Sequence, residues 1–299
     1  MSSPERFADL SSMPLQRIGA EQHLLRGTVS SVVDIFHQRE LLGLLVRRDL
    51  KSRYKNSALG FVWTLVRPLT QLLIYYFVVG QVLGAASGIP DFAVYVFSGL
   101  TVYTLFSEIL AGSTTSIVGN SGLIKKIYLP REIFPLATVG SALFNFCVQG
   151  TILLLATLVL GVPPHFPQFL YLLPALLIVV IYGFAFGLLL SALNVYLRDV
   201  QYLIEVGLMV LLWGSPIVYG WDMVRGRIGE GLALDAYTNN PVTLAVLGFH
   251  KAFWASGGPE AYPAELKLRM GIAILIGLVL LWMFQRVFAR MQGNFAQEL

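Results

Sequence analysis

The stretch Arg47–Tyr76, RRDLKSRYKNSALGFVWTLVRPLTQLLIYY, determines how the chain sits in a membrane. Five Lys and Arg residues fall between Arg47 and Lys55, and an apolar run follows that reaches about Leu83 with Arg67 as its only charge. Lys and Arg are retained on the cytoplasmic side, whereas an apolar run of this length crosses the bilayer. The stretch therefore predicts a cationic surface helix that leads directly into a membrane-spanning helix.

The composition of the whole chain is that of a membrane protein with several spans. Its 299 residues are 56% hydrophobic and 13% charged, whereas soluble domains carry about 25% charged residues. The mean hydropathy is +0.69. The net charge of +4 is modest and its basic residues cluster beside the apolar runs, which favours lipid headgroups or acidic substrate groups over nucleic acid. The single cysteine, Cys147, excludes an intrachain disulfide.

Six apolar runs have the length of about 20 residues that a membrane-crossing helix requires. We expect an all-α polytopic fold in which residues 58–288 form a six-span transmembrane domain. Residues 1–33 are polar, lack the apolar core of a signal peptide and are expected to form a cytoplasmic tail, as are residues 289–299. The predicted spans are Ala58–Leu83, Phe92–Ile117, Ile133–Leu160, Phe169–Leu193, Gln201–Val218 and Leu268–Phe288.

The distribution of Lys and Arg predicts that both termini are cytoplasmic. Nine Lys and Arg residues precede the first span, and the two short turns expected on the outer side carry none. Residues 34–57 show helical spacing of apolar residues beside Arg47, Lys51 and Lys55, which predicts an amphipathic interface helix in the inner headgroup layer. That helix serves either as a topological anchor only or also as a contact for a partner.

The outer segment, residues 219–267, is too structured for a plain loop. Pro241–Trp254, PVTLAVLGFHKAFW, is apolar and helical in spacing but too short to cross the bilayer. Irregular backbone at membrane depth must be buried in protein or line a cavity, so we expect a re-entrant helix that plugs an outer mouth. His250 within it has no second metal ligand nearby, and no metal site is expected.

No catalytic constellation occurs in the sequence. It has no P-loop, no H-E-x-x-H motif and no paired cysteines, so an energy source must lie in a partner or a gradient. Glu108 and Glu205 fall within the predicted spans, where a carboxylate is costly and usually faces an interior. A proton-coupled carrier would use such a group, although structural pairing or a polar lining position is the better interpretation for an isolated carboxylate.

Aromatic residues collect in the first and fifth predicted spans. They are expected either to form interfacial belts or to line a path in which aromatic faces stack on sugar rings without gripping one of them. The candidate lining residues are Phe61, Trp63, Tyr75, Tyr76, Tyr202, Trp213 and Tyr219.

The loop Gly119–Glu132, GNSGLIKKIYLPRE, is short and basic and lies between the second and third spans on the inner side. It is either a positive topological anchor or a docking element for a cytoplasmic motor.

Four stretches together resemble the membrane subunit of ABC-2 type polysaccharide exporters, the permeases for O-antigen, teichoic acid and galactan. They are spread in order through nearly the whole chain after residue 30. The stretches are RRDLKSRYKNSALGFVWTLVRPLTQLLIYYFVVG (Arg47–Gly80), KKIYLPREIFPLA (Lys125–Ala137), NVYLRDV (Asn194–Val200), and SPIVYGWDMV with NNPVT (Ser215–Val224, Asn239–Thr243).

The resemblance implies a homodimer in the plasma membrane that works with two copies of a separate ATPase subunit, which binds ATP and magnesium. The first and fifth spans would line the channel, and the outer segment would form gate helices. The cargo would be a glycan linked to a polyprenyl diphosphate. The resemblance places coupling to the ATPase on Lys125, Lys126, Tyr128, Leu129, Pro130 and Arg131, and contact with the diphosphate is inferred for Arg47, Arg48 and Arg53.

Two other functions remain open at this point. An exporter of the same superfamily for a drug or a small lipid would lack the combined aromatic lining and basic interface helix. A membrane-embedded glycosyl- or acyltransferase would need an Asp and His cluster at a membrane face, and the sequence shows none.

Overall fold

The structure is a computed structural model that describes residues 33–54, 62–82, 84, 88–126 and 129–299. Within these ranges the chain is helical, without strands. The helices are α3 (Arg39–Tyr54), α4 (Trp63–Ile74), η2 (Tyr75–Val82), α5 (Phe92–Gly119), α6 (Ser121–Ile124), α7 (Ile133–Val159), α8 (Phe166–Phe169), α9 (Leu172–Tyr196), α10 (Val200–Trp213), α11 (Trp221–Ile228), α12 (Leu232–Thr238), α13 (Pro241–Phe253), η4 (Pro259–Ala261), α14 (Leu266–Met291), η5 (Gln292–Asn294) and α15 (Phe295–Glu298).

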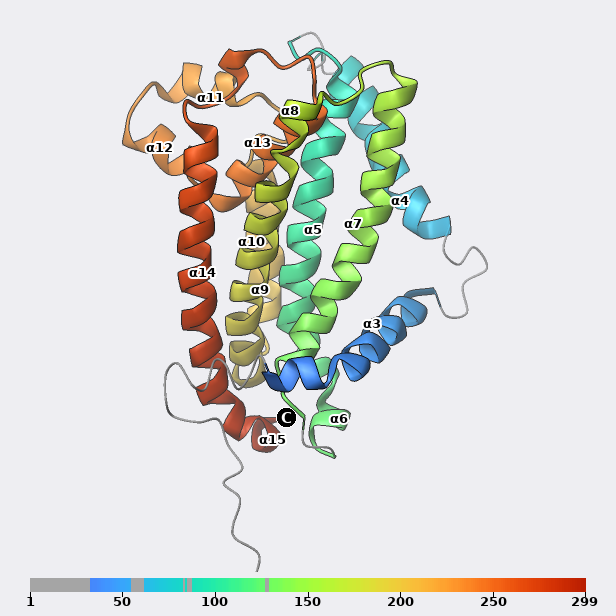
Figure 1. The fold of residues 1–299 in the computed structure, drawn as a ribbon, viewed down its shortest axis with the longest axis vertical. Helices are drawn as coiled ribbons and strands as arrows, with labels where there is room; N and C mark the ends of the chain where they lie inside the picture. The colour runs from blue at the N-terminus through green and yellow to red at the C-terminus, as the bar shows by residue number, and fades with distance from the viewer. Residues whose placement is uncertain (1–32, 55–61, 83, 85–87, 127–128) are drawn as a thin grey trace, which may run out of the picture.

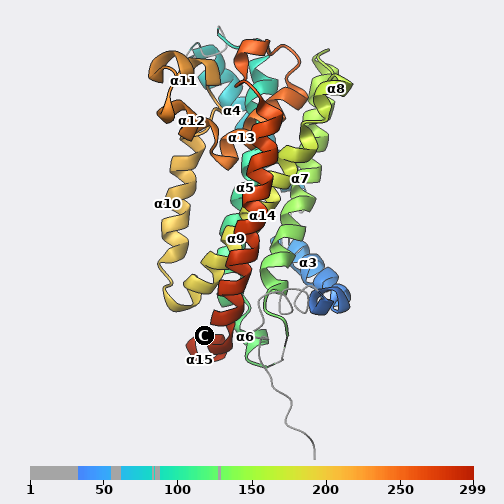
Figure 2. The ribbon, with the colours of Figure 1, turned by 60° about the vertical axis from the view of Figure 1, so that its left-hand side comes forward.

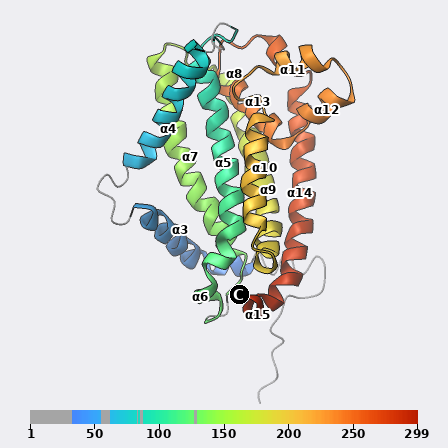
Figure 3. The same cartoon turned by 180° about the vertical axis from the view of Figure 1, so that it is seen from behind.

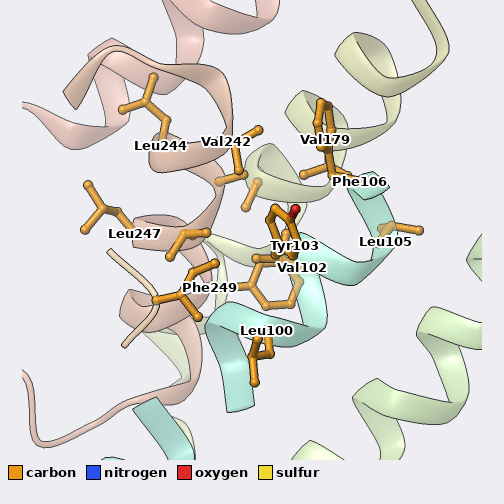
Figure 4. Packing of buried hydrophobic residues seen from close by; sticks show 14 of the residues in the cluster. Leu100, Val102, Tyr103, Leu105, Phe106, Val179, Val242, Leu244, Leu247 and Phe249 are labelled. Atoms are coloured by element: carbon orange, nitrogen blue, oxygen red, sulfur yellow. The ribbon is translucent and has the colours of Figure 1, made fainter. Parts of the chain in front are cut away.

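The long helices form an upright bundle with α5 and α9 at its centre (Figure 1). α5 packs against α7, α9, α10 and α13, while α9 also packs against α13 and α14. Most of α5 is buried, and its side chains meet those of α9 and α13 in the main apolar core, to which Phe106, Val179 and Phe249 all belong (Figure 4). The α5 helix is therefore enclosed by protein, whereas α14 keeps one apolar face exposed.

Glycines allow the two central helices to approach each other closely. A Cβ atom added at Gly183 of α9 would lie 2.9 Å from Cγ2 of Ile109, and one at Gly187 would lie 2.6 Å from Cβ of Ser113. Lipid tails are as apolar as the side chains, so helices in a bilayer associate mainly through close packing of small residues. The Gly-x-x-x-Gly spacing on α9 thus fixes the α5–α9 contact.

Five of the six predicted spans are helices long and apolar enough to cross a membrane. The exception is the fifth, because α10 ends at Trp213 and not at Val218 as predicted. Gly214 and Pro216 explain the early end, since glycine weakens a helix and proline cannot donate a backbone hydrogen bond. With 14 residues, α10 is about 21 Å long, and it runs alongside α5 and α9 (Figures 2 and 3).

The irregular backbone after α10 is buried and hydrogen-bonded. The hydroxyl of Tyr95 on α5 lies 3.0 Å from the carbonyl oxygen of Pro216 and 2.8 Å from that of Tyr219, and donates its single proton to either. Ser215 and Ile217 are fully buried. Tyr95 thereby satisfies a backbone break that would be costly in lipid.

The predicted short helix Pro241–Trp254 is confirmed as α13, which ends at Phe253. Its start is defined by Asn240, whose side chain accepts a hydrogen bond from the Val242 N–H at 2.9 Å, and by Pro241 at the first helical position. α13 is buried among α5, α9 and α14 of its own subunit. His250 stacks on the Tyr95 ring with centroids 3.8 Å apart, and the described residues contain no cluster of metal-ligating side chains.

The bundle has two distinct ends. One end carries α6, α15 and the nearby helix α3, and the opposite end carries α8, α11 and α12 (Figure 1); we call them the α6 end and the α8 end. α3 packs across the N-terminal part of α7. Leu45 of α3 is buried there, and a Cβ atom added at Gly140 of α7 would lie 2.8 Å from Cγ2 of Val46. The predicted helix before the first span therefore exists and is packed onto the bundle.

Candidate transport path and docking surface

Most of the predicted lining aromatics lie on α4, η2 and α10, three elements that all pack against α5. Trp63 of α4 is 50% exposed, and Tyr75 and Tyr76 of η2 are partly to largely exposed. On α10, Tyr202 and Trp213 are 59% and 58% exposed. Figure 3 shows α4 and α10 on either side of α5. Phe61 lies outside the described residues.

Tyr219 has a structural role that its sequence position did not indicate. Its hydroxyl donates a hydrogen bond to the Trp213 carbonyl at 2.7 Å and accepts one from the Tyr237 hydroxyl at 3.3 Å. It is only partly exposed. Tyr219 therefore ties the end of α10 to α12.

One face of α10 combines aromatic, apolar and charged residues. Tyr202, Glu205, Val206, Met209 and Trp213 recur at helical spacing and are all exposed. A carboxylate exposed to hydrocarbon costs about 2.5–3.5 kcal/mol at the bilayer centre and less near its surface. Glu205 lies in the second turn of α10, near the α6 end. This face is therefore better suited to contact with protein or water than with lipid.

Glu108 has a specific partner inside the bundle. The Asn145 side-chain N–H of α7 donates a hydrogen bond to Glu108 Oε2 of α5 at 2.7 Å. Asn145 is 4% exposed. The two side chains link α5 to α7 near the middle of both helices, as expected for a paired structural carboxylate.

The predicted coupling loop is short and held against the bundle at the α6 end. Lys125 and Lys126 are exposed, directly after α6. Leu129 is partly buried and packs on an apolar cluster of the bundle. Pro130 is half-buried. Arg131 lies with its Cζ 5.6 Å from the centroid of the Phe295 ring. Tyr128 lies outside the described residues.

The cations of α3 differ in how freely they can bind an anion. Arg47 is exposed. Arg48 is also exposed but forms an ion pair with Asp49 at 2.8 Å, which reduces the positive charge it presents. Lys51 is exposed on the same helix, whereas the side chain of Arg53 lies outside the described part of the chain. Arg47 and Lys51 are therefore exposed cations on the half of α3 that leads into the first span.

In the described part of the chain, five long apolar helices and closely packed glycines define an integral membrane protein. The chain belongs to the ABC-2 type transporter family, whose pattern it matches over residues 40–254. It is accordingly a membrane subunit of a transporter, and the family assignment places it outside the enzymes.

The chain is also similar to curated transport proteins along most of its length. It is 27% identical over 261 residues to an O-antigen export system permease protein RfbA of Klebsiella pneumoniae, covering 87% of this chain and 95% of that protein. Identity is again 27%, over 268 residues, with the protein of the same name in Myxococcus xanthus, covering 90% and 98%. The polysialic acid transport protein KpsM of Escherichia coli is 23% identical over 61% of this chain and 70% of its own length.

Proposed function

We propose that this chain is the membrane subunit through which a polysaccharide linked to a polyprenyl diphosphate leaves the cytoplasm, driven by a separate ATPase. The observation that carries the proposal is the similarity to O-antigen export permeases over 95% and 98% of their lengths. The sequence has no P-loop, so ATP and magnesium belong to the partner. The protein lies in the plasma membrane, and its α6 end, which carries the basic loop, faces the cytoplasm.

The path is formed by two copies of the chain. The exposed aromatic faces of α4, η2 and α10 are left unenclosed by the single subunit, and the mixed face with Tyr202 and Glu205 is poorly suited to lipid. Placing these faces toward a second copy gives a passage lined by aromatic rings. Sugar rings stack on such rings without being held at one position, so a polymer can slide. In this dimer α10 serves as the fifth of six spans, together with the buried segment that follows it. The packed α11–α13 segment closes the outer side.

The inner side carries the docking and binding surfaces. The loop Gly119–Glu132 docks one ATPase per subunit through its exposed lysines and the residues beside them. Arg47, with Arg48 and Arg53, holds the diphosphate of the cargo, because charge-assisted hydrogen bonds to phosphate oxygens are the strong interaction that guanidinium groups form. α3 lies in the inner headgroup layer, where its cations also contact anionic lipid.

Reconstitution tests the proposed cargo. The dimer and its ATPase, placed together in proteoliposomes, are expected to hydrolyse ATP faster when a polyprenyl-diphosphate glycan is added and to move that glycan into the lumen of inside-out vesicles. Stimulation by drugs or simple lipids without a glycan would instead identify an exporter of small molecules.

The lining role of the aromatics gives a separate prediction. Tyr75→Ala with Tyr202→Ala is expected to lower glycan export at least severalfold, because aromatic contacts with the sugar chain are lost, while membrane abundance and dimerisation persist. Residues of an interfacial belt would show the opposite pattern, with altered insertion and little change in export per dimer. Leu275→Ala on the exposed face of α14 is the matched control. Normal export by the well-expressed double variant would refute the lining role.

A further inference from the structure

The α6 end of the bundle has its own buried apolar cluster, separate from the main core. Helices far apart in the sequence contribute to it, among them Ile124 of α6, Phe134 of α7, Phe288 of α14 and Phe295 of α15. Leu129 of the coupling loop packs against the same cluster. The loop between the second and third spans and the C-terminal helix therefore share one core, and Figure 1 shows α6 and α15 at the same end of the bundle.

Phe295 is the central side chain of the C-terminal contact. It is fully buried, with 0% exposed surface. Its ring lies edge-on to Phe288, with centroids 5.5 Å apart, and 6.3 Å from the ring of Tyr196 at the end of α9. The Arg131 guanidinium lies over its remaining face at 5.6 Å, which is the arrangement of a cation–π contact. The exit of the coupling loop thus rests directly on α15.

A partly buried chain of polar side chains makes a second connection from the same loop exit. Glu132, immediately before α7, is only 3% exposed. Its carboxylate accepts a hydrogen bond from the Gln285 side chain of α14, and the Gln285 side-chain oxygen accepts one from Arg286 Nε at 2.8 Å. Burial is the largest influence on the pKa of Glu132 and raises it, and the nearby charge of Asp34 also raises it. The hydrogen bonds that Glu132 accepts and the positive charge of Arg286 oppose this rise.

This polar chain is only partly satisfied. Glu132 Oε1 and Arg286 Nη2 are both buried and have no hydrogen-bond partner among the residues that the structure describes. A buried network that is partly satisfied costs free energy in that arrangement. A shift of α14 relative to the loop exit can supply the missing partners, so the contact is suited to two arrangements.

We propose that Arg131, Glu132, Gln285, Arg286 and Phe295 form a joint, here called the inner joint, that transmits movement of the docked coupling loop to the last span. The proposal rests on the docking role assigned above to Gly119–Glu132. None of the predicted docking residues lies on the C-terminal helix α15. The proposal gives this helix a positioning role in transport. Binding of the ATPase and transmission of its movement are then carried by different residues.

Two variants separate transmission from binding. Phe295→Ala removes the ring on which Arg131 rests, and Glu132→Gln keeps the shape of the side chain but removes its charge. Each is compared in the reconstituted complex with Gln297→Ala, an exposed position on the same helix α15. The measurements are co-purification of the ATPase, glycan moved per ATP hydrolysed, and hydrogen exchange of residues 285–291 with and without ATPase and nucleotide.

Both variants are expected to retain the ATPase but to move about tenfold less glycan per ATP, a size typical of coupling between sites. The nucleotide-dependent change in hydrogen exchange at residues 285–291 should disappear with them and persist in Gln297→Ala. The exchange measurement does not depend on the cargo, so it tests the joint even where the proposed glycan fails to stimulate the wild type.

Three results would overturn the inner joint. Unchanged transport and exchange in both variants would show that α14 does not respond through these residues. Loss of ATPase binding would make the contact part of the docking surface, and an absent exchange response in the wild type would remove the movement itself. If Phe295→Ala does not fold, Glu132→Gln decides, because it leaves the packing of Phe295 intact.

Discussion

A Gly187→Leu substitution is expected to destabilise the folded bundle strongly and to lower its thermal survival. A Cβ atom at this position would lie 2.6 Å from Cβ and 3.0 Å from Oγ of Ser113, so α5 and α9 must separate before any side chain fits. Overpacking of tight cores typically costs about 1–3 kcal/mol, and here the displaced contact joins the two central helices. Adding Gly183→Leu, which meets Ile109 at 2.9 Å, should remove the folded form.

The measurement is the amount of monodisperse subunit that survives a temperature series on a sizing column. Gly271→Leu is the matched control, because it lies within α14 and no atom approaches its added Cβ within 4 Å. This control should behave nearly as the wild type, which separates close packing from any general effect of removing a glycine. Equal thermal survival of the Gly187 and Gly271 variants would show that the α5–α9 approach does not determine stability.

The sequence predicts most of the fold because the membrane imposes a simple length rule. The starts of α5 and α7 agree with the predicted spans to the residue, since Pro90 and Pro130 with charged neighbours interrupt the apolar runs there. The end of α10 is predicted wrongly because Ser215–Val218 remain apolar after the helix has broken at Gly214 and Pro216. Hydropathy measures transfer into lipid and does not register such a break.

The candidate site is harder to predict from the sequence than the fold is, because it depends on tertiary contacts. Leu129 is expected to contact a partner, and the sequence does not reveal that it also packs on an apolar cluster of the bundle. The role of Phe295 could not be predicted, since one aromatic residue in a polar tail has no periodicity to reveal burial. In contrast, the Gly-x-x-x-Gly spacing at Gly183 and Gly187 was a readable signal for helix contact in an apolar span. In the proposed dimer, which faces of α4 and α10 meet depends on the second copy and cannot be predicted from one sequence.

Loss of the coupling loop's apolar contacts is the second large effect that we expect. Tyr128→Ala with Leu129→Ala should release the ATPase or uncouple it, because truncating central apolar residues of an interface costs about 2 kcal/mol or more, which is about 30-fold in affinity. Leu129 contributes by packing the loop exit onto the bundle, which positions the exposed lysines before it for the partner. Co-purification and glycan-stimulated ATP hydrolysis measure both steps.

Lys125→Ala with Lys126→Ala should have a milder effect of a few-fold at most, because both side chains are exposed and exposed ion pairs contribute little. Their effect should fade as salt increases, since screening weakens attraction between exposed charges.

Leu281→Ala on α14 is the control for the Tyr128 and Leu129 double variant, because it loosens the apolar cluster on which Leu129 packs and leaves the loop sequence unchanged. If it matches the Tyr128 and Leu129 double variant, the loss is one of stability. If the double variant couples as the wild type does, the ATPase docks elsewhere, and α3 with its exposed Arg47 and Lys51 becomes the surface to test.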